Sequence, residues 1–447
     1  MNKTKIIATL GPSSYDKQIL QKMFTAGLNI VRFNFSHADY ETNKTMISIV
    51  KSLNKKLNTH VACLLDTKGP EIRTHNFKNE VLIKKDSLLK IFPKEILGDE
   101  NGFSVTYENF YEELHVGNII YIDDGFLTLQ VIEKTNNREL ITKAMNTHIV
   151  KSRRGVNVPN VNFSMKFISD KDYKDIVFAI ENDYEYIAAS FTRTSQDILD
   201  VKKILKDYKK DNIKIIAKIE NQSGIDHIDE ILEVADGIMI ARGDLGIEIQ
   251  DITVPFYQSI IIQKCLKKGK TAIVATQMLE SMQKNCRPTK AEISDVFNAV
   301  REGTSVTMLS GESASGIYPV ESVSYMYKIN HQAEKNLDYQ LLSRIYQPQN
   351  DREKLLFNVT QMALNSPINV IVVFNFADAY NISKFHPSTI VLALVNNPKE
   401  AKLLSFCFSV ITVLNENELN EKIKILNQNN QIKQNVIFVK ENIIEIK

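Results

Sequence analysis

The chain has 447 residues, of which 43% are hydrophobic and 24% are charged, and its formal net charge is +2. This length predicts more than one domain, and the composition is typical of a globular protein. The small net charge gives no reason to expect a nucleic acid or a membrane as partner, and the longest apolar runs are too short to span a bilayer. The N-terminus has no secretion-signal pattern and the four cysteines show no metal or redox spacing, so we expect a cytoplasmic protein with free thiols.

The first 70 residues predict three strand–helix units whose strands end in polar residues. These strands are expected at residues 3–9, 28–36 and 61–66. In the second strand, Arg32, Asn34 and Ser36 share a face because side chains alternate along a strand. The third strand ends in Asp66 and Thr67.

From about residue 74 to residue 155 the strand–helix rhythm stops. The sequence becomes alternating and rich in turns, and Asp124-Gly125 between two β runs is typical of a hairpin. We therefore predict a small all-β domain inserted into the larger one.

The strand–helix rhythm resumes near Asp170, with a helix expected over residues 172–182. Further strands are expected at residues 186–191, 213–221, 237–244, 270–277 and 304–312. Counting across the insertion gives eight strands, each followed by a helix-sized segment, which is typical of a (β/α)₈ barrel. An open doubly wound sheet is the alternative, but no glycine-rich dinucleotide turn is present.

After about residue 340 the pattern changes again. Apolar runs at 370–374 and 390–394 predict strands with helices between them, and therefore a further α/β domain. The predicted domain limits are 1–69 and 158–340 for the barrel, 70–157 for the inserted β domain and 341–447 for the C-terminal domain.

Two of the predicted barrel strands end in charged residues that alternate. Lys218 and Glu220 share one face, and Arg242 and Asp244 repeat the pattern on the next strand. The carboxyl ends of parallel barrel strands are where such enzymes carry their chemistry, and two hard oxygen ligands suit Mg²⁺ or Mn²⁺. The alternative is that Glu220 pairs with Lys218 while Asp244 caps the following helix.

Four cations are predicted at strand ends that face one mouth: Arg32, Arg73, Lys218 and Arg242. Such a set would bind phosphate or carboxylate groups, since arginine makes forked contacts and lysine acts as a point charge. A ring of structural salt bridges is the alternative. His37 follows the second strand and could contact phosphate.

A second set of oxygen ligands comes from two adjacent strand ends: Asn34, Ser36, Asp66 and Thr67. With one formal negative charge, this set suits a monovalent cation better than Mg²⁺. Hydrogen bonding to the backbone is the alternative, both for this set and for the hydroxyl of Thr276 at the end of a later strand.

Seven segments of the first 330 residues carry long motifs. They are ATLGPSS at 8–14, RFNFSH at 32–37, LDTKGPEIRT at 65–74, KIEN at 218–221, ARGDLG at 241–246, ATQMLESM at 275–282 and LSGESA at 309–314. In this order they resemble the pyruvate kinase family, to which the rest of the chain is similar only loosely. The resemblance implies an α/β fold: a TIM barrel with an inserted small β-barrel lid domain and a C-terminal α/β domain. It also implies phosphoryl transfer from phosphoenolpyruvate to ADP, giving pyruvate and ATP, with Mg²⁺ (or Mn²⁺) and K⁺, in a homotetramer.

The resemblance also implies roles for single residues. Glu220 and Asp244 match the divalent-metal ligands, while Arg32 and Lys218 match residues that hold the transferring phosphoryl group, with Lys218 also stabilising the enolate. Carboxylate binding is implied for the amides of Gly243 and Asp244 and the hydroxyl of Thr276, which is also implied in proton delivery. The implied potassium ligands are Asn34, Ser36, Asp66 and Thr67, and the implied nucleotide contacts are Asn34, His37, Arg73 and Arg154. Glu71 matches the acidic residue that accompanies potassium dependence.

The C-terminal domain departs from the family pattern. Where many relatives have a phosphate loop rich in glycine, serine and threonine, this chain has no glycine and an added aspartate at 375–381. Such a loop cradles phosphate poorly, so we predict no activation by a sugar phosphate at this position.

Two other functions are the alternatives to phosphoryl transfer. A metal-dependent lyase or aldolase on a related barrel would lack the Arg32 and Arg73 pair and the inserted β domain. A non-enzymatic regulatory relative would have lost one of the residues Lys218, Glu220, Asp244 or Thr276, and the chain keeps all four.

Overall fold

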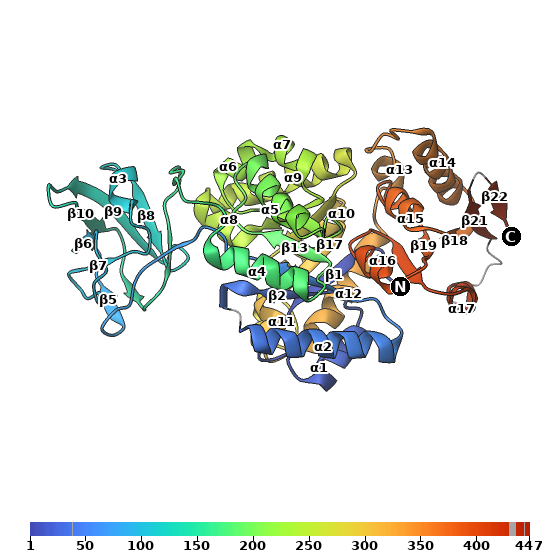
Figure 1. The fold of residues 1–447 in the computed structure, drawn as a ribbon, viewed down its shortest axis with the longest axis horizontal. Helices are drawn as coiled ribbons and strands as arrows, with labels where there is room; N and C mark the ends of the chain where they lie inside the picture. The colour runs from blue at the N-terminus through green and yellow to red at the C-terminus, as the bar shows by residue number, and fades with distance from the viewer. Residues whose placement is uncertain (38, 429–434, 442) are drawn as a thin grey trace.

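The computed structural model describes residues 1–37, 39–428, 435–441 and 443–447. Figure 1 shows three parts in a row, with an all-β part at one end, the barrel in the middle and an α/β part at the other end. Within the described residues, no helix is both long enough and apolar enough to cross a membrane.

The central part is a closed barrel of eight strands, paired in the order β1-β17-β16-β15-β14-β13-β3-β2. All eight pairings are parallel, which confirms the predicted barrel and excludes the open doubly wound sheet. The strands are short, largely buried and rich in Ile, Val and Ala, as expected for a sheet covered on both faces. Their bounds are β1 Lys5–Thr9, β2 Ile30–Asn34, β3 Ala62–Asp66, β13 Tyr186–Ala189, β14 Lys214–Ile219, β15 Gly237–Ala241, β16 Thr271–Ala275 and β17 Val306–Leu309.

Helices surround the barrel, and several begin at a capping side chain. Asp16 caps α1 by accepting from two backbone amides, and Ser169 with Asp172 forms a capping box at the start of α4. The helices are α1 Lys17–Thr25, α2 Tyr40–Leu57, α4 Asp170–Glu181, α5 Ser195–Asp207, α6 Gln222–Asp226, α7 Ile228–Val234, α8 Arg242–Glu248, α9 Val254–Lys268, α10 Lys290–Arg301, α11 Gly311–Ala314, α12 Pro319–Glu334 and α13 Tyr339–Leu342. The 3₁₀ turns are η1 Phe35–His37, η2 Asp251–Thr253 and η3 Glu280–Gln283.

Several strands end earlier than the sequence predicted, and two of these ends change the site. Strand β2 stops at Asn34, so Ser36 lies on a 3₁₀ turn and not on the strand face with Arg32. Strand β15 stops at Ala241, and Arg242 and Asp244 begin helix α8. The prediction that these two side chains share a face is therefore wrong, because residues two apart on a helix point roughly 200° apart. The first turn of a helix is a favourable place for a carboxylate such as Asp244.

The inserted part is a β domain between the first three barrel strands and the other five. It contains a seven-stranded sheet, in the order β4-β12-β8-β9-β10-β6-β7, and a two-stranded sheet. The predicted hairpin is confirmed, since β8 and β9 pair antiparallel around a turn in which Asp123, Asp124 and Gly125 all have positive φ. The elements are β4 Ile72–Arg73, β5 Val81–Ile83, β6 Leu88–Phe92, β7 Gly102–Ser104, α3 Phe110–Glu113, β8 Ile119–Ile122, β9 Leu127–Lys134, β10 Leu140–Ala144, β11 His148–Val150 and β12 Gly155–Asn157.

The C-terminal part is a five-stranded sheet, ordered β20-β19-β18-β21-β22, with helices around it. The first four strands are parallel and β22 is antiparallel to β21. The elements are α14 Asp351–Asn365, β18 Ile368–Val373, α15 Phe376–Ser383, β19 Ile390–Leu394, α16 Pro398–Leu403, β20 Val410–Val413, α17 Glu416–Gln428, β21 Asn435–Lys440 and β22 Ile443–Ile446. We propose residues 1–69 and 158–340 as the limits of the barrel, 70–157 as those of the inserted domain and 341–447 as those of the C-terminal domain.

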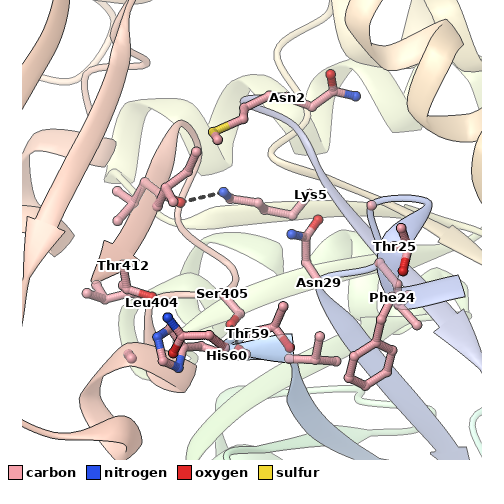
Figure 2. Close-up of a pocket in the computed structure, with 18 of the residues that line it drawn as sticks. Asn2, Lys5, Phe24, Thr25, Asn29, Thr59, His60, Leu404, Ser405 and Thr412 are labelled. Atoms are coloured by element: carbon pink, nitrogen blue, oxygen red, sulfur yellow. Dashed lines mark hydrogen bonds between the residues drawn. The ribbon is translucent and has the colours of Figure 1, made fainter. Parts of the chain in front are cut away.

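The C-terminal part closes the amino-terminal end of the barrel. Phe406 packs on Tyr186 with ring centroids 4.0 Å apart and belongs to the apolar cluster inside the barrel. Lys5, the first residue of β1, donates its ammonium to the carbonyl of Val410, across a cavity of about 530 Å³ between the two parts (Figure 2). Burial lowers the pKa of Lys5 to about 8. This cavity lies at the opposite end of the barrel from the carboxyl ends of the strands.

Candidate active site

Four of the charged residues predicted at the strand ends, Arg32, Asp66, Lys218 and Glu220, form a compact cluster around the ammonium of Lys218. This ammonium lies 3.0 Å from Asp66 Oδ1 and 3.0 Å from Glu220 Oε1, and it donates to Ser190 Oγ over 2.8 Å. Asp66 is shared, because its other oxygen accepts from Arg32 Nε over 2.6 Å. Period-two alternation at the end of β14 brings Lys218 and Glu220 together, and strand pairing brings Asp66 to them.

The charges of this cluster depend on one another. Burial lowers the pKa of Lys218, but the carboxylates of Asp66 and Glu220 outweigh it, so the pKa of Lys218 is raised overall. Burial likewise opposes ionisation of Asp66, but Arg32 and Lys218 hold its pKa below the ordinary value. Lys218 therefore keeps its proton and Asp66 stays ionised, which leaves a fixed cation at the mouth.

Glu220 and Asp244 form a pair of acids beside this cation. Glu220 is buried, and burial with the nearby charge of Asp244 raises its pKa to about 7, although Lys218 opposes the shift. Burial also raises the pKa of Asp244, although Lys218 and Glu220 oppose the shift. The remaining Glu220 oxygen accepts from the amide of Phe191 over 2.7 Å. Two close acids that resist ionisation are chemically suited to a divalent cation, which would allow both to be charged.

The pair could supply only part of a coordination shell. Among the described residues, no group of three or more His, Cys, Asp or Glu is arranged to hold a metal ion. Mg²⁺ is commonly bound by one or two carboxylates, with water and substrate oxygens completing the shell. Glu220 and Asp244 therefore fit a metal that binds together with its substrate.

Thr276 lies next to the start of helix α8. Its hydroxyl oxygen accepts from the amide of Gly243 over 2.7 Å, and the hydroxyl donates to the carbonyl of Ala275 over 2.6 Å. Thr276 and Gln277 both have left-handed backbone angles, with φ of 68° and 53°. The structure therefore brings Thr276, Gly243 and Asp244 together at one edge of the mouth.

The prediction that Arg242 is one of four cations facing the mouth is wrong. Its guanidinium pairs with Asp295 over 2.8 Å and donates to the carbonyls of Thr276 and Gln277 over 2.9 and 3.2 Å. The side chain is 10% exposed. These contacts match the alternative of structural salt bridges, and each of the other three cations also pairs with a carboxylate.

Comparisons with known proteins identify the family. A family model described as "Pyruvate kinase, barrel domain" matches residues 1–323. The pyruvate kinase of Staphylococcus saprophyticus is 43% identical over 430 residues, which cover 93% of this chain and 72% of that protein. The chain belongs to the pyruvate kinase family. The pyruvate kinase of Bacillus licheniformis is 41% identical over the same shares of both chains. A crystal structure of a pyruvate kinase from Cryptosporidium parvum superposes with a TM-score of 0.92 at 32% identity, covering 100% of this chain and 96% of that chain.

Membership of the pyruvate kinase family confirms the resemblance and the fold class predicted from the sequence. It makes the chain a phosphotransferase of the kinase type, which works with a divalent metal ion. Membership of this family excludes the lyase or aldolase, and the presence of Lys218, Glu220, Asp244 and Thr276 argues against the non-enzymatic relative.

Of the four residues that the pyruvate kinase resemblance assigns to the nucleotide, Arg73 and Arg154 lie in the inserted domain, while Asn34 and His37 lie at the end of the barrel strand β2 and in the turn after it. Arg73 belongs to strand β4 of that domain, not to a barrel strand end, and its guanidinium lies 2.6 Å from Glu71 Oε1. Arg154 lies 3.5 Å from Asp123, on the hairpin turn between β8 and β9. Asn34 ends β2, and the side chain of His37 lies outside the described part of the structure.

The four residues that match potassium ligands lie at the ends of two paired strands. Asn34 is opposite Asp66 in the register of β2 and β3. The amide of Ser36 donates to Asn34 Oδ1 over 3.2 Å, and Thr67 Oγ1 accepts from the amide of Ser190 over 3.1 Å. The side chains of Asn34 and Thr67 thus make backbone hydrogen bonds, which is the alternative given above, whereas Asp66 pairs with Arg32 and Lys218.

Two contacts of the site were not predicted from the sequence. Ser190 donates to Asp66 Oδ1 over 2.9 Å while accepting from Lys218, so one hydroxyl joins the two charges. A polar residue directly after the buried strand β13 was the available signal. Asn157, at the end of the inserted domain, donates to Glu248 Oε1 over 2.6 Å, which ties that domain to helix α8.

The C-terminal loop uses its polar groups internally. Asn375 caps helix α15 by accepting from the amide of Asp378 over 2.8 Å. The carboxylate of Asp378 pairs with the guanidinium of Arg352. A cap and a fixed anion at this helix start leave little to attract a phosphate group.

Proposed function

We propose that this chain transfers the phosphoryl group of phosphoenolpyruvate to ADP, giving pyruvate and ATP, at the carboxyl end of the barrel. Lys218 carries the proposal: a buried ammonium that keeps its proton, placed between Asp66 and Glu220. Phosphoryl transfer asks a protein mainly to position the reactants and to stabilise charge. Membership of the pyruvate kinase family supports the same reaction.

When the phosphoryl group leaves phosphoenolpyruvate, negative charge develops on the enolate oxygen. Lys218 stabilises this charge, and it does so as a fixed cation because its pKa is raised. Arg32 lies beside it, joined through Asp66, and its guanidinium binds oxygens of the transferring group in a forked contact. Glu220 and Asp244 hold Mg²⁺ (or Mn²⁺), which when bound neutralises phosphoryl and enolate charge.

The substrate carboxylate is proposed to bind beside Thr276. The amides of Gly243 and Asp244 and the hydroxyl of Thr276 surround one position at the start of α8, where backbone amides favour an anion. The Gly243 amide donates to Thr276 in the structure, so the carboxylate takes over that hydrogen bond. Thr276 also helps to deliver the proton that turns the enolate into pyruvate.

The nucleotide and the monovalent cation are proposed on the opposite edge. Asn34, Ser36, Asp66 and Thr67 offer K⁺ an all-oxygen set with one formal charge, and Glu71 fits a potassium-dependent member. We assign the nucleotide phosphates to Asn34, His37, Arg73 and Arg154. The inserted β domain is the lid that closes over the nucleotide and excludes water.

Three wider properties are proposals of the same kind. We propose a cytoplasmic enzyme and, as is typical of the family, a homotetramer. We also propose that no sugar phosphate activates it through the loop at 375–381. The carboxylate of Asp378 forms an ion pair with Arg352, and Asn375 caps helix α15. Turnover is expected to stay constant when fructose 1,6-bisphosphate is added at subsaturating phosphoenolpyruvate. A sharp rise in turnover would contradict this.

The proposed reaction is tested by pyruvate release from phosphoenolpyruvate and ADP with Mg²⁺, in the presence and absence of K⁺. Turnover is expected to rise with K⁺, because the bound ion adds positive charge that helps to neutralise the phosphates of the substrates. Turnover that is indifferent to K⁺ would keep the kinase and remove the monovalent site. A folded, metal-supplied protein without turnover would contradict the proposed reaction.

A further inference from the structure

Arg242 holds the turn that follows strand β16. It is the first residue of helix α8, and one of its terminal nitrogens donates to the carbonyls of both Thr276 and Gln277. The same nitrogen lies 3.0 Å from the sulfur of Met278. The other terminal nitrogen is fixed by Asp295 of helix α10, over 2.8 Å. One side chain thus links three consecutive residues of the turn to a neighbouring helix.

The backbone of this turn needs such support. Thr276 and Gln277 are both left-handed although neither is glycine, and threonine is β-branched. A β-branched residue in this region is an outlier that persists only where its surroundings hold it. Arg242 binds the carbonyls of Thr276 and Gln277. Just after the turn, the carboxylate of Glu312 accepts from the amide of Leu279 over 2.9 Å.

The turn decides where the Thr276 hydroxyl lies. With the left-handed backbone, Thr276 Oγ1 reaches the amide of Gly243, the residue that follows Arg242 in the chain. A return of Thr276 to the extended region would redirect its side chain and break this contact. The first two residues of α8 therefore both hold Thr276: the side chain of Arg242 binds its carbonyl, and the amide of Gly243 binds its hydroxyl.

We propose that Arg242 is a positioning residue for Thr276. Its guanidinium keeps the turn left-handed, and this holds the Thr276 hydroxyl beside Gly243 and Asp244 at the mouth. The inference rests on the proposed function, in which that hydroxyl contacts the substrate. Arg242 itself is not assigned to the substrate, because its two terminal nitrogens are engaged by Asp295 and by the two carbonyls and its side chain is only 10% exposed.

A double-mutant cycle tests the inference. Arg242→Lys keeps the cation for Asp295 but loses the planar fork that reaches both carbonyls. We expect it to lower kcat/KM for phosphoenolpyruvate by about 10- to 100-fold, as a small misplacement of a substrate-contacting group does. In a Thr276→Val background, which has the same shape without the hydroxyl, the same change is expected to cost less than about threefold, since coupled residues are not additive.

A matched control separates positioning from general stability. Arg352 makes a forked pair with Asp378 in the C-terminal domain, away from the mouth. Arg352→Lys is expected to lower Tm to a similar extent as Arg242→Lys while kcat/KM stays within about twofold of the unchanged protein. A second variant, Asp295→Asn, keeps Arg242 but weakens its anchor, and it covers the case in which Arg242→Lys fails to fold.

Three results would overturn the inference. One is an Arg242→Lys protein with kcat/KM close to that of the unchanged chain. Another is an equal loss with and without the Thr276 hydroxyl, which would show that Arg242 acts independently. Neither of these two results affects the proposed function, provided that the unchanged chain makes pyruvate. If the unchanged chain makes no pyruvate, both the proposed function and this inference fail.

Discussion

Replacing Lys218 with methionine is expected to lower the turnover of phosphoenolpyruvate and ADP by about 10³-fold or more, the scale seen when a preorganised donor to a developing oxyanion is lost. Methionine is close to lysine in length and keeps the apolar stem, so the change removes mainly the charge. The enolate then lacks its fixed cation, and Asp66 and Glu220 lose the partner that lies 3.0 Å from each. The measurement is steady-state pyruvate formation with saturating Mg²⁺.

Lys5 provides a matched control for this substitution. It is also a buried lysine of a barrel strand, 3% exposed against 7% for Lys218, but it lies at the opposite end of the barrel. Its pKa is lowered by burial, which outweighs the nearby charge of Glu334, and its ammonium donates to the carbonyl of Val410. Lys5→Met is expected to keep turnover within about threefold, whatever its effect on Tm. Comparable losses in both variants would show that buried lysines of this barrel act through stability alone.

The same geometry indicates which group delivers the proton to the enolate. A lysine whose pKa is raised by Asp66 and Glu220 stays protonated throughout the neutral range. It therefore stabilises charge and does not deliver the proton to the enolate. That step falls to Thr276 or to water beside it, which is why the position of the Thr276 hydroxyl matters.

The barrel could be predicted from the sequence because each strand is a short buried run that ends in polar residues. Lys218 and Glu220 could be paired for a local reason, because Glu220 directly follows β14 and the alternation of that strand carries over by one residue. Arg242 and Asp244 showed the same spacing, but the strand ends at Ala241 and a helix begins. Strand ends are set by tertiary contacts, so the same spacing gave a correct prediction in one case and a wrong one in the other.

Partners that come from distant parts of the chain were beyond sequence reasoning. Asp295, which removes Arg242 from the mouth, is 53 residues further along the chain and on another helix. Ser190 joins Lys218 to Asp66 from a third strand, and a serine after a strand is too common to single out. Charge type could be read from the sequence, whereas the direction of each long side chain depended on these contacts.

The second large effect is expected for Glu220→Gln, which removes one of the two acids proposed to hold Mg²⁺. Turnover at a fixed Mg²⁺ concentration is expected to fall by about 10²- to 10³-fold, because glutamine lacks the charge that neutralises the metal. The Tm of the unchanged protein is expected to rise when Mg²⁺ and phosphoenolpyruvate are added together, and this rise should be lost in the variant. A variant with an undiminished rise would exclude Glu220 as a metal ligand.

The pH dependence of the stability of the metal-free protein tests the protonation of Glu220 independently. Burial raises the pKa of Glu220 to about 7, so the folded state binds this proton more tightly than the unfolded state. Its contribution to stability is therefore present at low pH and is lost as pH rises from about 4.5 to about 7, which is the reverse of an ordinary salt-bridged carboxylate. With a chelator present, the Tm of the unchanged chain minus that of Glu220→Gln is expected to fall between about pH 5 and about pH 8.

Glu353 is the matched control for this titration. It is buried in the C-terminal domain, where burial opposes its ionisation but the amide of Gln349 and the ammonium of Lys384 outweigh it and lower its pKa. Its stabilising contribution is therefore complete above its ordinary pKa and is lost only in acid. The Tm difference for Glu353→Gln is expected to stay level between about pH 5 and about pH 8, and Mg²⁺ should still raise the Tm of that variant. Two buried glutamates of one chain should thus respond differently to pH in this range. At Glu220 burial and the nearby charge of Asp244 outweigh Lys218, whereas at Glu353 the amide of Gln349 and the ammonium of Lys384 outweigh burial.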